Sequence, residues 1–218
     1  MKIIQKASVL LGALLGLAGT ASATAFVESG DAGQSLAAAQ VIYGSGAVTS
    51  IAGTFASGND ADLYKIRIDT PGLFHVSAVG TPSDGLLFLF DANGKGVVYR
   101  DDKTHQGGNY GDLTNQFVLA SGYYYLGVSL YDNLPLSSGG LIFPESTATG
   151  NSGLEFQATA PGGAFALTGW NNAGPSNATG NYTITLQGVQ AVPEPSSIAL
   201  IAIALGGIAL FRRRRSME

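Results

Sequence analysis

The sequence of 218 residues contains no cysteine and only two histidines. Without cysteine the chain cannot form disulfides, use a thiol nucleophile or build a cysteine-based zinc site. His75 and His105 lie far apart in the sequence, and no H-E-x-x-H, P-loop or G-x-S-x-G pattern accompanies them. These absences favour a non-catalytic protein over the alternative, a secreted hydrolase of unrecognised type.

Basic residues are scarce in the middle of the chain. Between Thr24 and Ala191 there are five Lys and Arg against thirteen Asp and Glu, although the whole chain has a net charge of only −4. No basic stripe is present to neutralise phosphates, and this excludes nucleic acid as a partner. Such acidity suits solubility or the binding of divalent cations, and charge alone does not separate the two.

The beginning of the chain has the pattern of an export signal. Lys2 and Lys6 precede an apolar stretch from Ala7 to Ala18, and small residues in two A-x-A arrangements follow, the first ending at Ala23. This pattern predicts a signal peptide over residues 1–23, recognised by the Sec machinery and removed from the mature protein.

The end of the chain predicts a membrane anchor. Ile198 to Phe211 is a run of 14 residues without a charge, and Arg212, Arg213, Arg214 and Arg215 follow it directly. A helix of this length is short for a bilayer, but arginines that reach the headgroup region lengthen the span. Clustered arginines stay cytoplasmic, so we expect one helix in the inner membrane with its C-terminus inside.

The sorting motif stands just before this run. Val192, Pro193, Glu194 and Pro195, followed by the apolar run and the arginine cluster, resemble the PEP-CTERM sorting signal of exopolysaccharide-producing Gram-negative bacteria. The resemblance over 192–218 implies that the membrane protease-transpeptidase exosortase recognises and processes the tail. It also implies a mature protein at the cell surface or outside the cell, associated with exopolysaccharide and biofilm. Prolines on both sides of Glu194 exclude helix and favour an extended, accessible strip.

Between the two ends the pattern is that of short strands. Leu63 to Ile68 alternates, with Lys65 and Arg67 on one face, and Leu86 to Phe90 is continuously apolar, as in a strand buried on both sides. Asp91-Ala92-Asn93-Gly94 predicts a turn, and Asn181 to Leu186 alternates again. The sequence therefore predicts an all-β, jelly-roll-like antiparallel β-sandwich over 24–191, flanked by the signal peptide and the single transmembrane helix.

Four short stretches carry a second resemblance. They are Asn59-Asp60-Ala61-Asp62-Leu63-Tyr64, Leu86 to Gly94, Ala120 to Leu126, and Gly180 to Ile184. In this order they resemble bacterial pre-peptidase C-terminal (PPC) domains. The resemblance implies a jelly-roll-like accessory or binding module, several examples of which bind calcium. A long insertion at about 133–180 departs from the pattern.

Two kinds of binding residue can be named. Asp60 and Asp62 are two apart at a strand entrance, so both carboxylates can point to one side, and Asn59 adds a carbonyl oxygen. The resemblance implies that Asp84 approaches the same edge, which gives a candidate calcium site at Asn59, Asp60, Asp62 and Asp84; the alternative is that the polar residues here form turns. Trp170, in the insertion, is either an exposed platform for a sugar ring or a lid on one end of the core.

Overall fold

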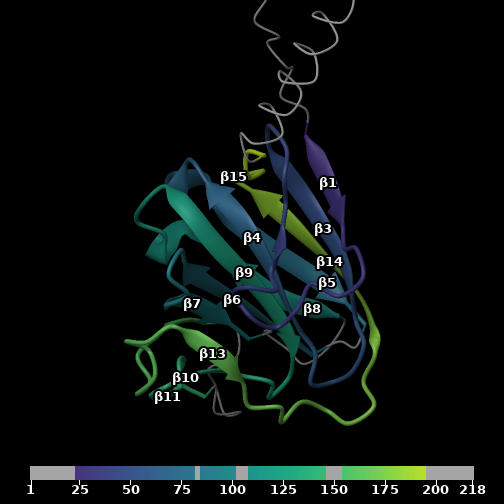
Figure 1. The fold of residues 1–218 in the computed structure, drawn as a ribbon, viewed down its shortest axis with the longest axis vertical. Helices are drawn as coiled ribbons and strands as arrows, with labels where there is room; N and C mark the ends of the chain where they lie inside the picture. Colours follow the sequence, from purple (N-terminus) through teal and green to yellow (C-terminus); the bar gives the residue numbers. More distant parts are fainter. Residues whose placement is uncertain (1–22, 82–83, 102–107, 146–153, 195–218) are drawn as a thin grey trace, which may run out of the picture.

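The computed structural model describes residues 23–81, 84–101, 108–145 and 154–194. Two β-sheets lie face to face in this part of the chain (Figure 1). The start of the first strand and the last strand lie at the same end of the molecule (Figure 1). The predicted signal peptide, the predicted transmembrane helix and the arginine cluster fall almost entirely outside the described residues.

Within the described residues, the first sheet has five strands and the second has seven. The first, in spatial order, contains β1 (Thr24–Val27), β3 (Val48–Phe55), β14 (Gly180–Gln187), β5 (His75–Gly80) and β8 (Asn109–Leu113). The second contains β12 (Glu155–Gln157), β7 (Gly96–Arg100), β6 (Gly85–Asp91), β9 (Gly122–Leu130), β4 (Ala61–Ile68) and β15 (Val189–Gln190), with β2 (Gln40–Val41) also paired to β4. Two short 3-10 helices, η1 (Pro71–Leu73) and η2 (Asn115–Phe117), lie in the connections.

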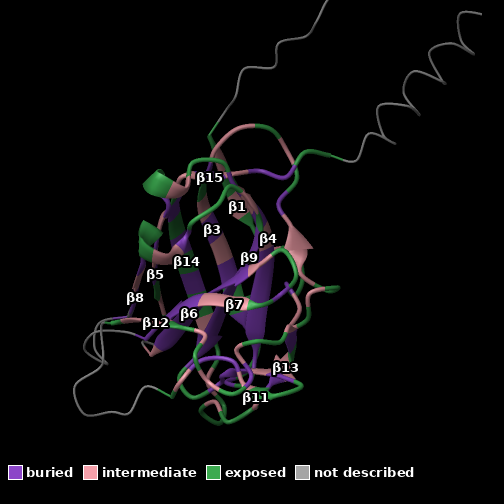
Figure 2. Ribbon diagram, turned by 90° about the vertical axis from the view of Figure 1, so that its left-hand side faces the viewer, coloured by how far each residue is buried: buried purple, intermediate pink, exposed green. Residues whose placement is uncertain are grey.

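The main core fills the space between the two sheets. It is built from alternate residues of each strand, such as Ile51 and Ile184 from the first sheet and Tyr64, Leu87 and Leu126 from the second. Figure 2 shows these buried positions as purple bands on the strands. The predicted β-sandwich is therefore confirmed. The expectation of purely antiparallel sheets is wrong, because β1 runs parallel to β3 and β2 runs parallel to β4.

A second apolar cluster lies on the outer face of the seven-stranded sheet. Leu86, Phe88 and Phe90 of β6 point into this cluster, whereas Leu87 and Leu89 point into the main core. The strand is thus buried on both sides, as its unbroken apolar sequence predicts. Without a further layer this apolar outer face of the sheet would be exposed to water.

The predicted insertion provides that third layer. It contains the small sheet of β11 (Gly140–Leu141), β10 (Pro135–Ser137) and β13 (Leu167–Trp170), and β12 adds to the edge of the large sheet beside β7. Phe143 and Trp170 of the insertion pack on Phe88, with ring centroids 5.8 Å and 5.5 Å away. The described part of the insertion is therefore packed on the sandwich.

The turn after β6 forms as predicted. Asp91 accepts hydrogen bonds through Oδ1 from the N–H groups of Asn93 (2.8 Å) and Lys95 (2.9 Å). Gly94 has φ of +80°, a left-handed conformation that glycine adopts without strain.

Candidate functional site

The first residue of the sorting motif, Val192, belongs to the folded domain. Its N–H donates to the carbonyl oxygen of Ile42 (2.7 Å), and its own carbonyl oxygen accepts from the N–H of Gly44 (3.0 Å). Val192 is only 8% exposed, whereas Pro193 and Glu194 are exposed. The motif thus starts directly at the edge of the fold. Pro195, like Arg212 to Arg215, lies outside the described residues.

The chain that leads to Val192 is held on both sides. On one side Gln190 of β15 pairs with Arg67 of β4. On the other side Gln190 forms a bridge with Ala47, and the N–H of Ala191 donates to the carbonyl oxygen of Gly46 (2.9 Å). No flexible linker separates the described domain from the exposed residues of the motif.

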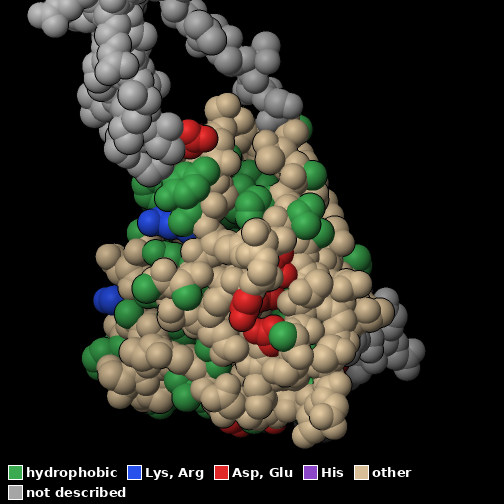
Figure 3. Space-filling model, turned by 45° about the vertical axis from the view of Figure 1, so that its right-hand side comes forward, with side chains coloured by type: hydrophobic (Ala, Val, Ile, Leu, Met, Phe, Trp, Pro, Cys, Tyr) green, Lys and Arg blue, Asp and Glu red, His purple; other side chains and the backbone are tan. Residues whose placement is uncertain are grey.

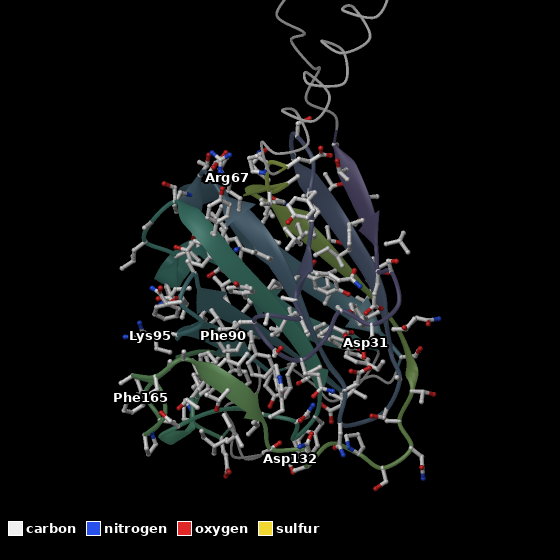
Figure 4. All side chains as sticks on the ribbon, viewed as in Figure 1. Asp31, Arg67, Phe90, Lys95, Asp132 and Phe165 are labelled. Carbon is white, nitrogen blue, oxygen red and sulfur yellow. The ribbon has the colours of Figure 1, made fainter. Side chains whose placement is uncertain are left out.

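A cluster of carboxylates lies beside β1 and β4. Glu28, Asp31 and Asp62 each place one oxygen within 4.8 Å of the others. Glu28 and Asp31 follow β1, and Asp62 is the second residue of β4. Figure 3 shows Asp and Glu side chains gathered on this face, and Figure 4 shows Asp31 beside β1 and β3. The three carboxylates differ in solvent exposure: Asp31 is exposed, Glu28 is half-buried and Asp62 is fully buried.

Two tyrosines hold the buried carboxylate. The hydroxyl of Tyr182 donates to Asp62 Oδ2 (2.6 Å), and the hydroxyl oxygens of Tyr182 and Tyr64 lie 2.5 Å apart. Since the Tyr182 proton goes to Asp62, the hydroxyl of Tyr64 donates to Tyr182. Burial raises the pKa values of both tyrosines well above the usual range, so both stay protonated. Asp62 Oδ1 is buried and has no hydrogen-bond partner among the described residues.

The environment of Asp62 disfavours its charge. Burial raises the pKa of Asp62 from its ordinary value of 3.8 to about 8, although the hydrogen bond from Tyr182 opposes the rise. The nearby carboxylates of Asp60, Glu28 and Asp31 contribute to the same rise. A buried carboxylate among like charges is stable in its ionised form only if a cation or a further donor compensates it.

The other predicted calcium ligands have different places. Asp60 lies next to the cluster, but its carboxylate accepts from the Ala56 N–H (2.7 Å) and from Gln34 Nε2 (3.5 Å). Burial raises the pKa of Asp60 as well. Asn59 is exposed in the turn before β4. Asp84 precedes β6, which is separated from β4 by β9, so the structure does not bring Asp84 to Asp62.

Sequence reasoning missed Glu28 and Asp31. They stand in Glu28-Ser29-Gly30-Asp31, a short glycine-containing stretch with no metal-binding spacing. Glu28 is fixed by its own structural bonds, from the N–H groups of Ala32 and Thr54 (both 2.8 Å). Asp31 accepts from the N–H of Gly33 (2.9 Å), the pattern of a turn-forming aspartate. The parallel pairing of β1 and β3 brings both residues beside β4.

Trp170 is not an exposed platform. Only 5% of its surface is exposed, and its ring meets Phe88 edge to face at an interplanar angle of 76°. Its Nε1–H donates to the carbonyl oxygen of Gln34 (2.9 Å). The prediction of a ligand platform at Trp170 is therefore wrong, because a large apolar ring next to an uncovered aromatic cluster gains more from burial than from exposure. The residue covers the outer cluster instead.

Comparison with known proteins identifies the tail. A family model described as the PEP-CTERM protein-sorting motif matches residues 191–215. The chain carries a PEP-CTERM sorting motif. The motif indicates exosortase-dependent sorting of an exported protein, as the sequence predicts. No curated protein matches the chain.

The described residues contain no helix that is long and apolar enough to span a membrane.

Proposed function

We propose that this protein is a non-catalytic module of the cell surface or extracellular matrix, which exosortase processes and which then binds exopolysaccharide. Before processing, the C-terminal helix holds it in the inner membrane. The PPC-like sequence features of its sandwich support an accessory or binding role, and a bound calcium ion stabilises the fold. The observation that carries the proposal is the character of the outer face of the five-stranded sheet.

That outer face is rich in hydroxyl and amide groups. Across the sheet, Thr185 of β14 lies between Ser50 of β3 and Ser77 of β5, and Asn181 pairs with Thr54. Asn181, Thr183, Thr185 and Gln187 are all exposed on the same side of β14. Uncharged groups that both donate and accept hydrogen bonds match the hydroxyls of a neutral sugar chain.

Two shallow grooves run along this face on either side of β14. One has a volume of about 340 Å³ and is lined by Val27, Glu28, Ala52 and Thr54. The other has a volume of about 270 Å³ and is lined by Val79, Gly80 and Thr81. Asn181, Tyr182 and Thr183 line both grooves. Open grooves of this kind suit an extended polymer better than a small substrate that must be enclosed.

We expect the double substitution Asn181→Ala and Thr183→Ala to weaken binding to exopolysaccharide purified from the source bacterium by about tenfold, because each side chain contributes a hydrogen bond. The measurement is co-sedimentation with the insoluble polysaccharide. Gln157→Ala with Thr168→Ala is the matched control, since it removes one exposed amide and one exposed hydroxyl from other strands. Equal binding by both double variants would contradict this role of the sheet face.

Calcium fits the carboxylate cluster. The ion prefers oxygen ligands at about 2.3–2.6 Å, so two ligands on opposite sides of it lie roughly 4.8 Å apart. Glu28, Asp31 and Asp62 meet this spacing, and Asp62 Oδ1 lacks a partner that a cation would supply. These three residues, with Asp60 close by, replace the predicted set of Asn59, Asp60, Asp62 and Asp84. A bound cation would neutralise the charges that disfavour ionised Asp62.

We expect millimolar calcium to raise the melting temperature of the purified protein, and Asp31→Asn to reduce this gain strongly. Binding to the native state alone adds about 2.7 kcal/mol at a hundredfold excess over the dissociation constant. Asparagine keeps the turn at residue 31 and removes one charged ligand. Glu145→Gln makes the same change in net charge at an exposed site away from the cluster, and it should keep the full response. Identical melting curves in calcium and in EDTA would exclude the site.

A further inference from the structure

The short distance between the sorting motif and the fold restricts how the exosortase can approach. From Val192, which is fixed by hydrogen bonds, the chain reaches Glu194 in two residues, a span of at most about 7 Å. An enzyme that encloses Pro193 and Glu194 must therefore lie against the domain surface. We propose that the exosortase docks on the domain surface around Val192, formed by Tyr43, Lys65 and Tyr123, and reads this surface together with the motif. The inference rests on exosortase-dependent sorting.

The backbone of Val192 supports a composite surface. Its N–H and its carbonyl oxygen are both bonded within the domain, to Ile42 and Gly44. A protease cleft that pairs with an extended substrate cannot use these groups while the domain is intact. Contacts with neighbouring side chains of the domain take the place of those backbone contacts.

The side chains around Val192 have the character of an interface. Tyr43, which pairs with Val192, is 50% exposed, and Tyr123 of β9 is 42% exposed. The Lys65 ammonium lies over the Tyr123 ring, 5.5 Å from its centroid. Tyrosine is one of the residue types that are enriched in the energetically important part of protein interfaces.

The elements of the fold bring these residues to one end of the molecule. Val41 of β2 pairs with Lys65 of β4, and the Ile42 N–H donates to the Lys65 carbonyl oxygen (3.3 Å). Tyr123 pairs with Arg67, which in turn pairs with Gln190 close to the motif. Figure 4 places Arg67 at this end, and Figure 3 shows hydrophobic side chains gathered there beside Lys or Arg. Lys65 places one of the five basic residues between Thr24 and Ala191 on this surface, whereas the neighbouring Arg67 forms an ion pair with Asp69 (2.7 Å).

The first test removes the aromatic contacts in the full chain, expressed in the source bacterium. Processing is followed by pulse-chase labelling with mass spectrometry of the C-terminus. We expect Tyr43→Ser with Tyr123→Ser to slow processing about tenfold, which is the size of effect that loss of an aromatic anchor has at a protein interface. Tyr131→Ser is the matched control because Tyr131 is 43% exposed and adjoins Asp132 at the opposite end. Equal processing rates for the double variant and wild type would overturn the proposal. The exposed tyrosines would then contact lipid, or no partner, during processing.

The second test moves the motif away from the domain. Inserting five Gly and Ser residues followed by a valine between Val192 and Pro193 keeps a valine in front of Pro193, moves the motif up to roughly 20 Å from the domain and leaves the spacing between motif and helix unchanged. We expect slower processing, as in the tyrosine variant. Faster or unchanged processing would overturn the proposal and would show that the domain only hinders access to the motif.

A further control separates failure of this inference from failure of exosortase sorting. Replacing Pro193-Glu194-Pro195 by three alanines should abolish processing whatever the role of the domain surface. If the wild-type chain itself keeps an intact C-terminus, sorting by exosortase is refuted, and the docking surface with it. If wild type is processed and the triple variant is not, the tyrosine and insertion variants decide the docking surface alone.

Discussion

Asp62→Asn is expected to stabilise the calcium-free protein at pH 8 and to abolish its response to calcium. Burial and neighbouring carboxylates raise the pKa of Asp62 to about 8. The folded state must therefore either hold a proton that the unfolded chain has released or bury an uncompensated charge. Asparagine imitates the neutral form, can still accept from Tyr182, and can donate from Nδ2 to the adjacent carboxylates. The gain is on the order of 5 kcal/mol, which is comparable to the net stability of many domains.

The raised pKa of Asp62 also determines how the free energy of unfolding changes with pH. In the unfolded chain the carboxyl group loses its proton near its ordinary pKa of 3.8, whereas in the folded protein it does so near 8. Between these values the folded state binds more protons, so the free energy of unfolding falls as pH rises. In wild-type protein in EDTA, the Asp62 carboxyl group should therefore make its full contribution to the free energy of unfolding below pH 4. This contribution should be lost progressively as pH rises to about 8.

Urea unfolding in EDTA at several pH values tests the prediction. The difference in free energy of unfolding between Asp62→Asn and wild type should grow from pH 4 to pH 8. The Glu145→Gln variant provides the control, since it changes an exposed acid and should follow the wild-type curve. In calcium the wild-type curve should rise at high pH, because binding requires the ionised form. A pH-independent difference between Asp62→Asn and wild type would refute the role given to this carboxyl group.

Much of the sandwich could be predicted because its strands have clear periodicity. In β4 the alternation places Tyr64, Ile66 and Ile68 in the core, with Lys65 and Arg67 on the other face, as the sequence predicts. The unbroken apolar run of β6 also predicts its burial on both sides. Local patterns of this kind depend only on which face of a strand meets water.

The candidate site was less predictable because it depends on contacts between distant segments. Glu28 and Asp62 are 34 positions apart in the sequence, and they meet because β1 pairs in parallel with β3. Two parallel strands are not joined by a hairpin turn, so no local sequence pattern predicts their pairing. The resemblance predicts Asp84 at the same edge as Asp60 and Asp62, but Asp84 precedes β6, and β9 lies between β6 and β4. The pairing of Val192 with the domain was also not predicted. The prolines after it predict an exposed strip, but they do not determine the contacts of the residue before them.

Trp170 illustrates how an insertion can decide the role of a residue. Its neighbours in sequence, Gly169 and Asn171, would suit either an exposed loop or a packed strand. What decides between them is the uncovered aromatic surface of the large sheet, which becomes visible only in three dimensions. The small sheet of β10, β11 and β13 covers that surface, and Trp170 is the largest side chain that it contributes.

Trp170→Ala is therefore expected to destabilise the protein by about 3 to 5 kcal/mol, the usual cost of removing a large buried aromatic side chain. The substitution removes the edge-to-face contact with Phe88 and leaves the carbonyl oxygen of Gln34 without its donor. Because the outer cluster is separate from the main core, the small sheet should open before the sandwich unfolds. Hydrogen exchange at the amides of Gly169 and Asn171 should accelerate much more than exchange in β4 and β14.

Two further variants separate the contribution of ring packing at Trp170 from that of its hydrogen bond and from that of an exposed ring. Trp170→Phe keeps an aromatic ring against Phe88 but loses the hydrogen bond to Gln34, so it should cost about 1 to 2 kcal/mol. Phe165→Ala removes an exposed aromatic ring from the same insertion and should change the free energy of unfolding by roughly 0.5 kcal/mol or less. Equal effects of Trp170→Ala and Phe165→Ala in urea unfolding would mean that Trp170 does not hold the small sheet on the sandwich. Uniform acceleration of exchange across β4, β13 and β14 would instead mean that the outer cluster and the main core unfold as one unit.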